Sequence, residues 1–272
     1  MNLANARVVL RPRTLADVVD LALPFALAGR RPLFATAALT LGPVAALVAL
    51  LRLWAHWRWP ALWLVVLGAW WFLDGACTVV VGELLFKDPR EVRARASVRR
   101  FFGRWPALVT AISLRAIVLG LAGSLVVLPL FVAPGTQFLR EAMLLENAKM
   151  GRAWTRSRSL ARHRGSFCFG LWLATILLPP LGALLGDGLG NSVVAFVLQL
   201  GFPFGELFKD GGSGFAVAGA LLAMPIAASA RFLGYVDLRT RKEGWDVQLR
   251  FMHLVAESAT SGARVNAGRR VA

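Results

Sequence analysis

Five stretches of the sequence are long and apolar enough to cross a lipid bilayer as helices. They cover residues 33–51, 59–81, 105–131, 167–186 and 215–235. The hydrocarbon core of a bilayer is about 30 Å thick, so a crossing helix needs roughly 20 predominantly apolar residues. Hydrophobic residues also make up 57% of the chain, which exceeds their share in ordinary soluble domains. The predicted fold class is therefore an all-α membrane protein.

The positive charges lie beside these apolar stretches. Of the 31 Lys and Arg residues, 26 fall in four segments, 1–31, 87–104, 149–164 and 231–272. Cytoplasmic loops have such an excess because Lys and Arg stay near anionic headgroups. This placement favours a bilayer with anionic headgroups, and not a nucleic acid, as the partner of the basic surface. It also predicts a bacterial inner-membrane protein with both termini cytoplasmic.

Four basic segments on one side require an even number of crossings between neighbouring segments. We therefore predict six spans in three hairpins within one membrane domain, residues 1–255. A turn at 129–135, where two prolines and a glycine interrupt any helix, would close the central hairpin. The expected spans are about 33–54, 59–82, 105–128, 132–148, 167–186 and 214–235.

Two further segments do not form spans in this prediction. The apolar run 192–204 has only 13 residues, too few to cross the bilayer. We expect a short re-entrant or interfacial helix there. The last residues, 256–272, are rich in Ala, Gly, Ser and Arg and are predicted to form a disordered cytoplasmic tail.

A basic segment precedes each predicted hairpin, and we expect each to form an amphipathic helix in the membrane interface. In the first, Thr14 and Asp17 can cap a helix start, and Pro24 should end or kink the helix. In the second, Asp88 and Glu91 are typical of a helix start. The alternative is that these segments are solvated basic linkers.

The third basic segment has the clearest helical pattern. Its apolar positions recur at helical spacing, and its arginines fall between them. The predicted apolar stripe consists of Met150, Ala153, Trp154, Ser157, Leu160 and Ala161, and the residues turned away from it are Arg152, Arg156, Arg158 and Arg162.

Two motifs resemble a family of bacterial multi-span proteins. Residues 134–160, "PGTQFLREAMLLENAKMGRAWTRSRSL", combine an LLE segment with an Ala-aromatic-x-Arg-Ser pattern, and residues 235–247, "YVDLRTRKEGWDV", contain Tyr-x-Asp-x-Arg-x-Arg-x-Glu-Gly. Together they resemble the glycerophosphoryl diester phosphodiesterase membrane-domain family. The matching positions are Glu146, Ala153, Trp154, Arg156, Ser157, Tyr235, Asp237, Arg239, Arg241, Glu243 and Gly244.

This resemblance implies six spans with both termini inside, and it implies no activity. The phosphodiesterase chemistry of fused relatives resides in a separate soluble barrel, for which this chain has no room. The acids among the bases of the second motif predict pairing of Asp237 or Glu243 with arginines of 149–164. The alternative is a solvated helix end whose surface pairs contribute little.

Asp74 and Arg115 are the charges that lie well inside the strongly apolar spans. The charged helix predicted over 132–148, with Arg140, Glu141 and Glu146, is instead expected to run in protein. A charge at the bilayer centre costs at least about 2.5–3.5 kcal/mol, so such groups usually face a partner or a wet cavity. The positions of Asp74 and Arg115 along their two helices place them at similar depth, which predicts an intramembrane ion pair. A transport or proton-relay site is the alternative.

Patterns typical of catalysis are sparse. Cys77 and Cys168 both lie in apolar spans, and three scattered histidines form no metal or nucleophile motif. We expect no cofactor, no metal and no enzymatic activity. The predicted function is a non-catalytic membrane scaffold or accessory subunit that docks a membrane or cytoplasmic protein partner on its basic helices. The alternative is a transporter or channel-like module that uses Asp74 and Arg115.

Overall fold

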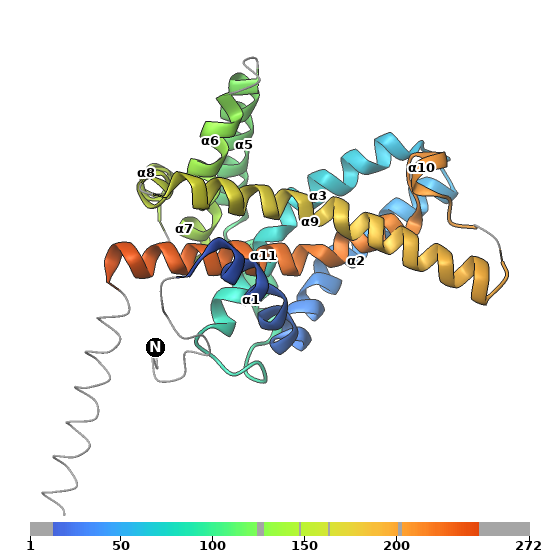
Figure 1. Ribbon diagram of the computed structural model, residues 1–272, viewed down its shortest axis with the longest axis horizontal. Helices are drawn as coiled ribbons and strands as arrows, with labels where there is room; N and C mark the ends of the chain where they lie inside the picture. The colour runs from blue at the N-terminus through green and yellow to red at the C-terminus, as the bar shows by residue number, and fades with distance from the viewer. Residues whose placement is uncertain (1–12, 124–127, 147, 163, 201–202, 245–272) are drawn as a thin grey trace, which may run out of the picture.

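The computed structural model describes residues 13–123, 128–146, 148–162, 164–200 and 203–244 (Figure 1). Every regular element in these ranges is a helix, which confirms the all-α class. The predicted tail, 256–272, lies outside the described residues. The helices are α1 (Leu15–Ala28), α2 (Arg30–Leu53), α3 (Trp59–Leu84), α4 (Ala94–Gly103), α5 (Trp105–Gly123), α6 (Leu128–Thr136), α7 (Leu139–Leu145), α8 (Met150–Ala161), α9 (Gly165–Ser192), the π-helix η2 (Val193–Val197), α10 (Leu207–Asp210) and α11 (Gly214–Glu243).

Four of these helices are long and apolar enough to cross a membrane: α2, α3, α9 with η2, and α11. A fifth candidate exists if α4 and the following α5, which meet at a bend of 68°, are taken together as one broken span. The chain is therefore all-helical, with four or five candidate membrane spans in the described residues. The arrangement of six spans in three hairpins stays a prediction.

Helix α11 lies at the centre of the molecule. Among the four candidate spans it has the largest buried share, whereas α9 has the smallest. It packs along α9 and also against α1, α2 and α3. In Figure 1, α9 and α11 run side by side, while α5 and α6 lead away from that pair. The core consequently surrounds α11 and the second half of α3.

The helix predicted over 132–148 is replaced by two short helices. α6 ends at Thr136, α7 begins at Leu139, and neither is long enough to cross a bilayer. Almost all of α7 is buried in protein, including the charged Arg140 and Glu141. The break turns α7 into the interior, where these two side chains meet partners that lipid could not supply.

The short helix predicted over 192–204 forms only in part, and it is continuous with α9. α9 continues to Ser192 and passes directly into η2, and a loop follows. The Asp187 carboxylate fixes this end of α9, because it accepts hydrogen bonds from the Asn191 amide (2.9 Å), the Ser213 hydroxyl and the Leu207 backbone N–H (3.3 Å). These bonds hold Leu207 and Ser213 against the helix.

The three basic segments form α1, α4 and α8. Thr14 and Asp17 form a reciprocal capping box at the start of α1, as predicted, but α1 continues through Pro24. α4 begins at Ala94, later than predicted, because the Asp88 carboxylate closes a turn with the Arg90 backbone N–H (2.9 Å) before the helix starts. In α8, the predicted stripe faces inward, with its Ala153, Ser157, Leu160 and Ala161 buried.

Glycines allow the backbones of α9 and α11 to approach each other closely. A Cβ placed on Gly219 of α11 would lie 2.1 Å from the Gly182 carbonyl oxygen of α9, and one on Gly186 would lie 2.4 Å from the Phe215 carbonyl oxygen. Small residues at such contacts let membrane helices associate through backbone packing. This contact fixes the spacing of α9 from the central helix.

We expect Gly219→Ala to destabilise the protein, because the new methyl group would collide with the backbone of α9. Overpacking of this kind costs about 1–3 kcal/mol. The measurement is thermal unfolding of the purified protein in detergent. Gly188→Ala is the matched control, because this α9 position has open space around a Cβ and should be neutral or slightly stabilising. Equal melting temperatures for the two variants would contradict the close contact.

Candidate functional site

Four charged side chains meet in the interior of the molecule. The Asp74 Oδ2 atom, on α3, lies 2.6 Å from Nη1 of Arg140 on α7 and 2.5 Å from Nη2 of Arg231 on α11. The Nε atom of Arg231 also lies 2.5 Å from Oε1 of Glu141 on α7. We call Asp74, Arg140, Glu141 and Arg231 the buried charge cluster. It joins α3, α7 and α11 in one ion-pair network.

The cluster is almost completely shielded from solvent. Asp74 and Glu141 are 0% exposed, and Arg140 and Arg231 are 7% and 6% exposed. The hydroxyl of Thr78 lies 3.2 Å from Nη2 of Arg231, so this guanidinium contacts two acids and a hydroxyl. Burying an ion costs several kcal/mol unless partners compensate for lost hydration. Each member of the cluster has at least one partner of opposite charge.

Arg115 does not form its predicted ion pair with Asp74. Asp74 and Arg115 are both buried, at 0% and 9% exposure. However, the predicted pairing of Asp74 with Arg115 is wrong, because Asp74 forms its ion pairs with Arg140 and Arg231. Arg115 forms no ion pair within the described residues. The prediction compared the depths of Asp74 and Arg115 along their own two helices. It did not include α7 and α11, which contribute the arginines that pair with Asp74.

The buried charges do not balance when Arg115 is included. Three arginines face two carboxylates, which leaves one excess positive charge in the interior. Several polar atoms of the region also have no hydrogen-bond partner among the described residues: Asp74 Oδ1, Arg115 Nε, Arg140 Nε and Glu141 Oε2. The cluster is thus strongly paired but not fully satisfied. Its two cations and two acids balance, so the excess positive charge is that of Arg115, and it favours an anion over a cation beside that residue.

A second set of contacts centres on Glu146, immediately after α7. The Tyr235 hydroxyl of α11 donates a hydrogen bond to Glu146, and Arg239 of the same helix lies 3.3 Å from this carboxylate. From α8, the Nε atom of Arg156 lies 3.2 Å away. The structure therefore brings together four positions of the predicted family motifs, and they attach α8 to α11.

Three other motif positions, Ser157, Asp237 and Arg241, form contacts that do not involve Glu146. The Ser157 hydroxyl donates to the Gly135 carbonyl (2.8 Å) and so ties α8 to α6. The carboxylate of Asp237 accepts from the Arg13 backbone N–H (2.7 Å) and from Arg241 Nε (2.9 Å). The predicted pairing of Asp237 with arginines of 149–164 is therefore wrong, since Arg241, one turn further along, is closer.

Trp154 and Gly244 form no ion pair within the described residues. Trp154 is half-buried on one flank of α8. Gly244 follows the last turn of α11 with φ +59°, the left-handed conformation that favours glycine at a helix end. The side chain of Glu243 lies outside the described residues, so its predicted pairing is not tested.

The chemistry available at these sites is that of ion pairing. In the described part of the chain, no group of three or more His, Cys, Asp or Glu side chains is arranged to hold a metal ion. Cys77 and Cys168 are both buried. These charged groups cross-link α3, α7, α8 and α11.

No protein-family model matches the chain, and searches of curated proteins and of solved structures found no match. The resemblance to the phosphodiesterase membrane-domain family stays a prediction. The fold and the cluster define an all-helical protein with several helices suited to a membrane and a buried network of charges.

Sequence reasoning missed Arg140, Glu141 and Arg231 as members of the cluster. A signal for them was present, because adjacent opposite charges at 140 and 141 in an otherwise apolar segment need internal partners. The charge pattern alone assigns Arg231 to the basic segment 231–272. Arg231 lies more than two turns before Lys242, the end of the apolar helix, and is therefore well inside that helix.

We expect Arg231→Met to lower the free energy of unfolding by about 3–5 kcal/mol, because it leaves Glu141 without its ion-pair partner and removes one of two from Asp74. Arg115→Met is the matched control: it removes a buried arginine of the same size but breaks no ion pair, so the loss should be much smaller. The measurement is the free energy of unfolding of the purified protein in detergent, obtained from thermal or chemical denaturation. An equal loss in both variants would contradict the assigned pairs.

Proposed function

We propose that this chain is a non-catalytic scaffold or accessory subunit of a bacterial inner membrane, with both termini cytoplasmic, which docks an acidic partner on its basic helices. The observation that supports this most strongly is the attachment of α8. Its inward face is held by Ser157 and by the Arg156–Glu146 ion pair, while Arg152, Arg158 and Arg162 are exposed. A solvated linker would not hold these arginines in a fixed array.

The distribution of acids supports the same proposal. Glu83 is largely buried and pairs with Arg100 at 2.5 Å, Glu146 pairs with Arg156 and Arg239, and Asp237 pairs with Arg241. These carboxylates are engaged with Arg100, Arg156, Arg239 and Arg241. On α4 and α8, the exposed arginines that keep no ion pair within the described residues are Arg95 and Arg99 of α4 and Arg152, Arg158 and Arg162 of α8. A basic surface that remains uncompensated favours a partner with acidic side chains.

The α4 helix offers the sharpest test, because Arg95 and Arg99 are exposed and form no ion pair in the described residues. We expect Arg95→Glu/Arg99→Glu to reduce the amount of a stoichiometric companion retained on purification from native membranes by at least tenfold. Like charges across an interface cost several kcal/mol. The measurement is quantitative mass spectrometry of the complex after mild solubilisation.

The matched control is Arg58→Glu with Arg52→Glu, at the opposite end of α3 and α2. These residues are also exposed and give the same change in charge. The control should keep the companion. If both pairs of substitutions lose it equally, or if the parent protein is isolated without a stoichiometric companion, the scaffold proposal is wrong.

The excess buried charge favours one alternative function, a transporter or channel-like module for an anion. Arg115 is buried without an ion pair in the described residues, and its Nε atom has no hydrogen-bond partner there. The test is chloride flux in proteoliposomes. On this alternative, the parent conducts and Arg115→Met lowers the rate at least tenfold, while Arg95→Met leaves it unchanged. No flux in the parent, or equal flux in Arg115→Met, would reject it.

A further inference from the structure

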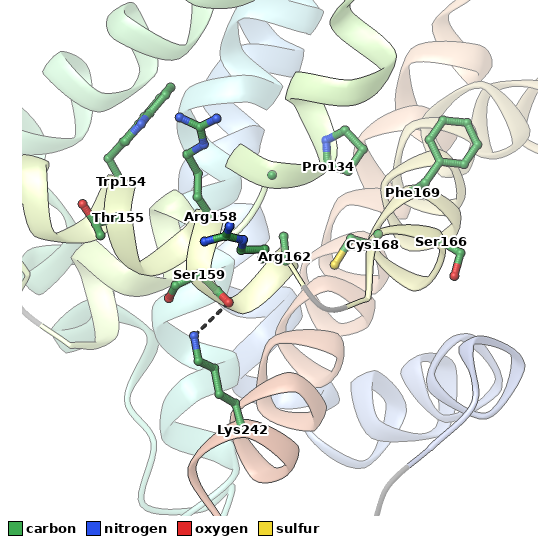
Figure 2. A pocket seen from close by; sticks show the side chains of 13 residues that line it. Pro134, Trp154, Thr155, Arg158, Ser159, Arg162, Ser166, Cys168, Phe169 and Lys242 are labelled. Carbon is green, nitrogen blue, oxygen red and sulfur yellow. Dashed lines mark hydrogen bonds between the residues drawn. The ribbon is translucent and has the colours of Figure 1, made fainter.

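A large groove lies where α8 meets the start of α9 (Figure 2). Its volume is about 1130 Å³. The end of α6 closes one side of it, and Lys242 reaches it from the last turn of α11. Its walls include Pro134, Trp154, Arg158, Arg162, Phe169 and Lys242.

The polar part of the groove is cationic. Arg158 and Arg162 are exposed, and neither forms an ion pair within the described residues. The Lys242 ammonium donates one hydrogen bond to the Ser159 carbonyl (2.8 Å), drawn as a dashed line in Figure 2, and has two further N–H groups. None of the lining residues is an acid. Arg158, Arg162 and Lys242 give the groove positive charge without an ion-pair partner in the described part of the chain, which favours an anionic group such as a phosphate.

The other part of the groove is apolar and continues along α9. Trp154 and Pro134 flank the cations, and Phe169 lies on α9 itself (Figure 2). From Phe169 an exposed apolar stripe follows the helix at spacings of three and four residues, through Leu173, Ile176 and Leu177. A ligand in the groove could therefore place a charged group among the cations and an apolar chain against the stripe.

We propose that this groove binds one anionic phospholipid, with its phosphate held by Arg158, Arg162 and Lys242 and an acyl chain lying along the exposed stripe of α9. The site shares Arg158 and Arg162 with the proposed docking surface, but it goes beyond the proposed function because it requires no protein partner and does not include Arg95 or Arg99. The charge complementarity is that of basic pockets between membrane helices, where each Lys or Arg near the headgroup strengthens binding. Trp154 suits the headgroup level, where amphipathic rings are enriched.

Three features favour a lipid over a free phosphate ion. The groove is larger than an ion requires, its apolar wall would gain nothing from a free ion, and the stripe extends from the cations along α9, a candidate membrane span. A water-soluble phosphate would use only the cations. The lipid and the ion therefore differ in their dependence on the apolar wall.

The test is binding of phosphatidylglycerol to the purified full-length chain in neutral detergent, measured by native mass spectrometry over a range of lipid concentrations. We expect one saturable site, with phosphatidylcholine binding at least tenfold more weakly. Arg158→Gln/Arg162→Gln should raise the dissociation constant for phosphatidylglycerol at least tenfold. Arg95→Gln/Arg99→Gln is the matched control, with the same loss of charge on α4, and should bind as the parent does.

A second variant fills the groove without changing its charge. A Cβ on Gly135 would meet nothing within 4 Å, so Gly135→Leu can extend into the groove and remain compatible with the helix. It should lose the saturable lipid site although all three cations remain. Inorganic phosphate at millimolar concentration should not displace the lipid.

Several results would overturn the proposal. Equal loss in the α4 control would mean general attraction of anionic lipid to a basic surface. Unchanged binding in both Gly135→Leu and Arg158→Gln/Arg162→Gln would place any lipid elsewhere. Efficient displacement by inorganic phosphate, or equal binding of phosphatidylcholine, would exclude a site for an anionic lipid.

Discussion

The double ion pair of Arg231 is the interaction on which the arrangement of the helices depends. This one guanidinium contacts Asp74 of α3 and Glu141 of α7 from the centre of α11. A buried arginine with two carboxylates has its charge compensated from two directions, and the carboxylates are compensated in turn. Because the cluster is buried, its members cannot exchange protein partners for water. The positions of α3, α7 and α11 are therefore set relative to one another.

The other helices are placed around this centre by different means. α9 is held against α11 by backbone contact at Gly182 and Gly219, where a side chain would not fit. α8 is held by Glu146 and by the Ser157 hydroxyl. Apolar packing gives little preference between helices in lipid, so that specific arrangement requires such contacts. The charged and the glycine contacts thus share the task that a hydrophobic core performs in a soluble protein.

The apolar runs and the capping residues predicted much of the secondary structure. The length of an apolar run depends on composition alone, and α2, α3, α9 and α11 were evident from it, as was the reciprocal cap of Thr14 and Asp17. The partners of Asp74 were not evident. They depend on where α7 turns, and that break follows from contacts with α3 and α11 that no local pattern contains. The contacts of Asp237 with Arg241 and with the Arg13 backbone likewise depend on how the helices pack and not on a local sequence pattern.

The distances along the chain between members of the buried cluster determine the order in which it can form during synthesis. Asp74 and Arg140 are separated by 66 positions, and Glu141 and Arg231 by 90. Ribosomes add roughly 5–20 residues per second, so Glu141 exists for about 5–20 s before its cation partner is made. During that interval, the neighbouring Arg140 and water are the partners available to the Glu141 carboxylate. Final closure of the interior therefore waits for the last long helix, and a chain that terminates before residue 231 contains the acids without the arginine that joins them.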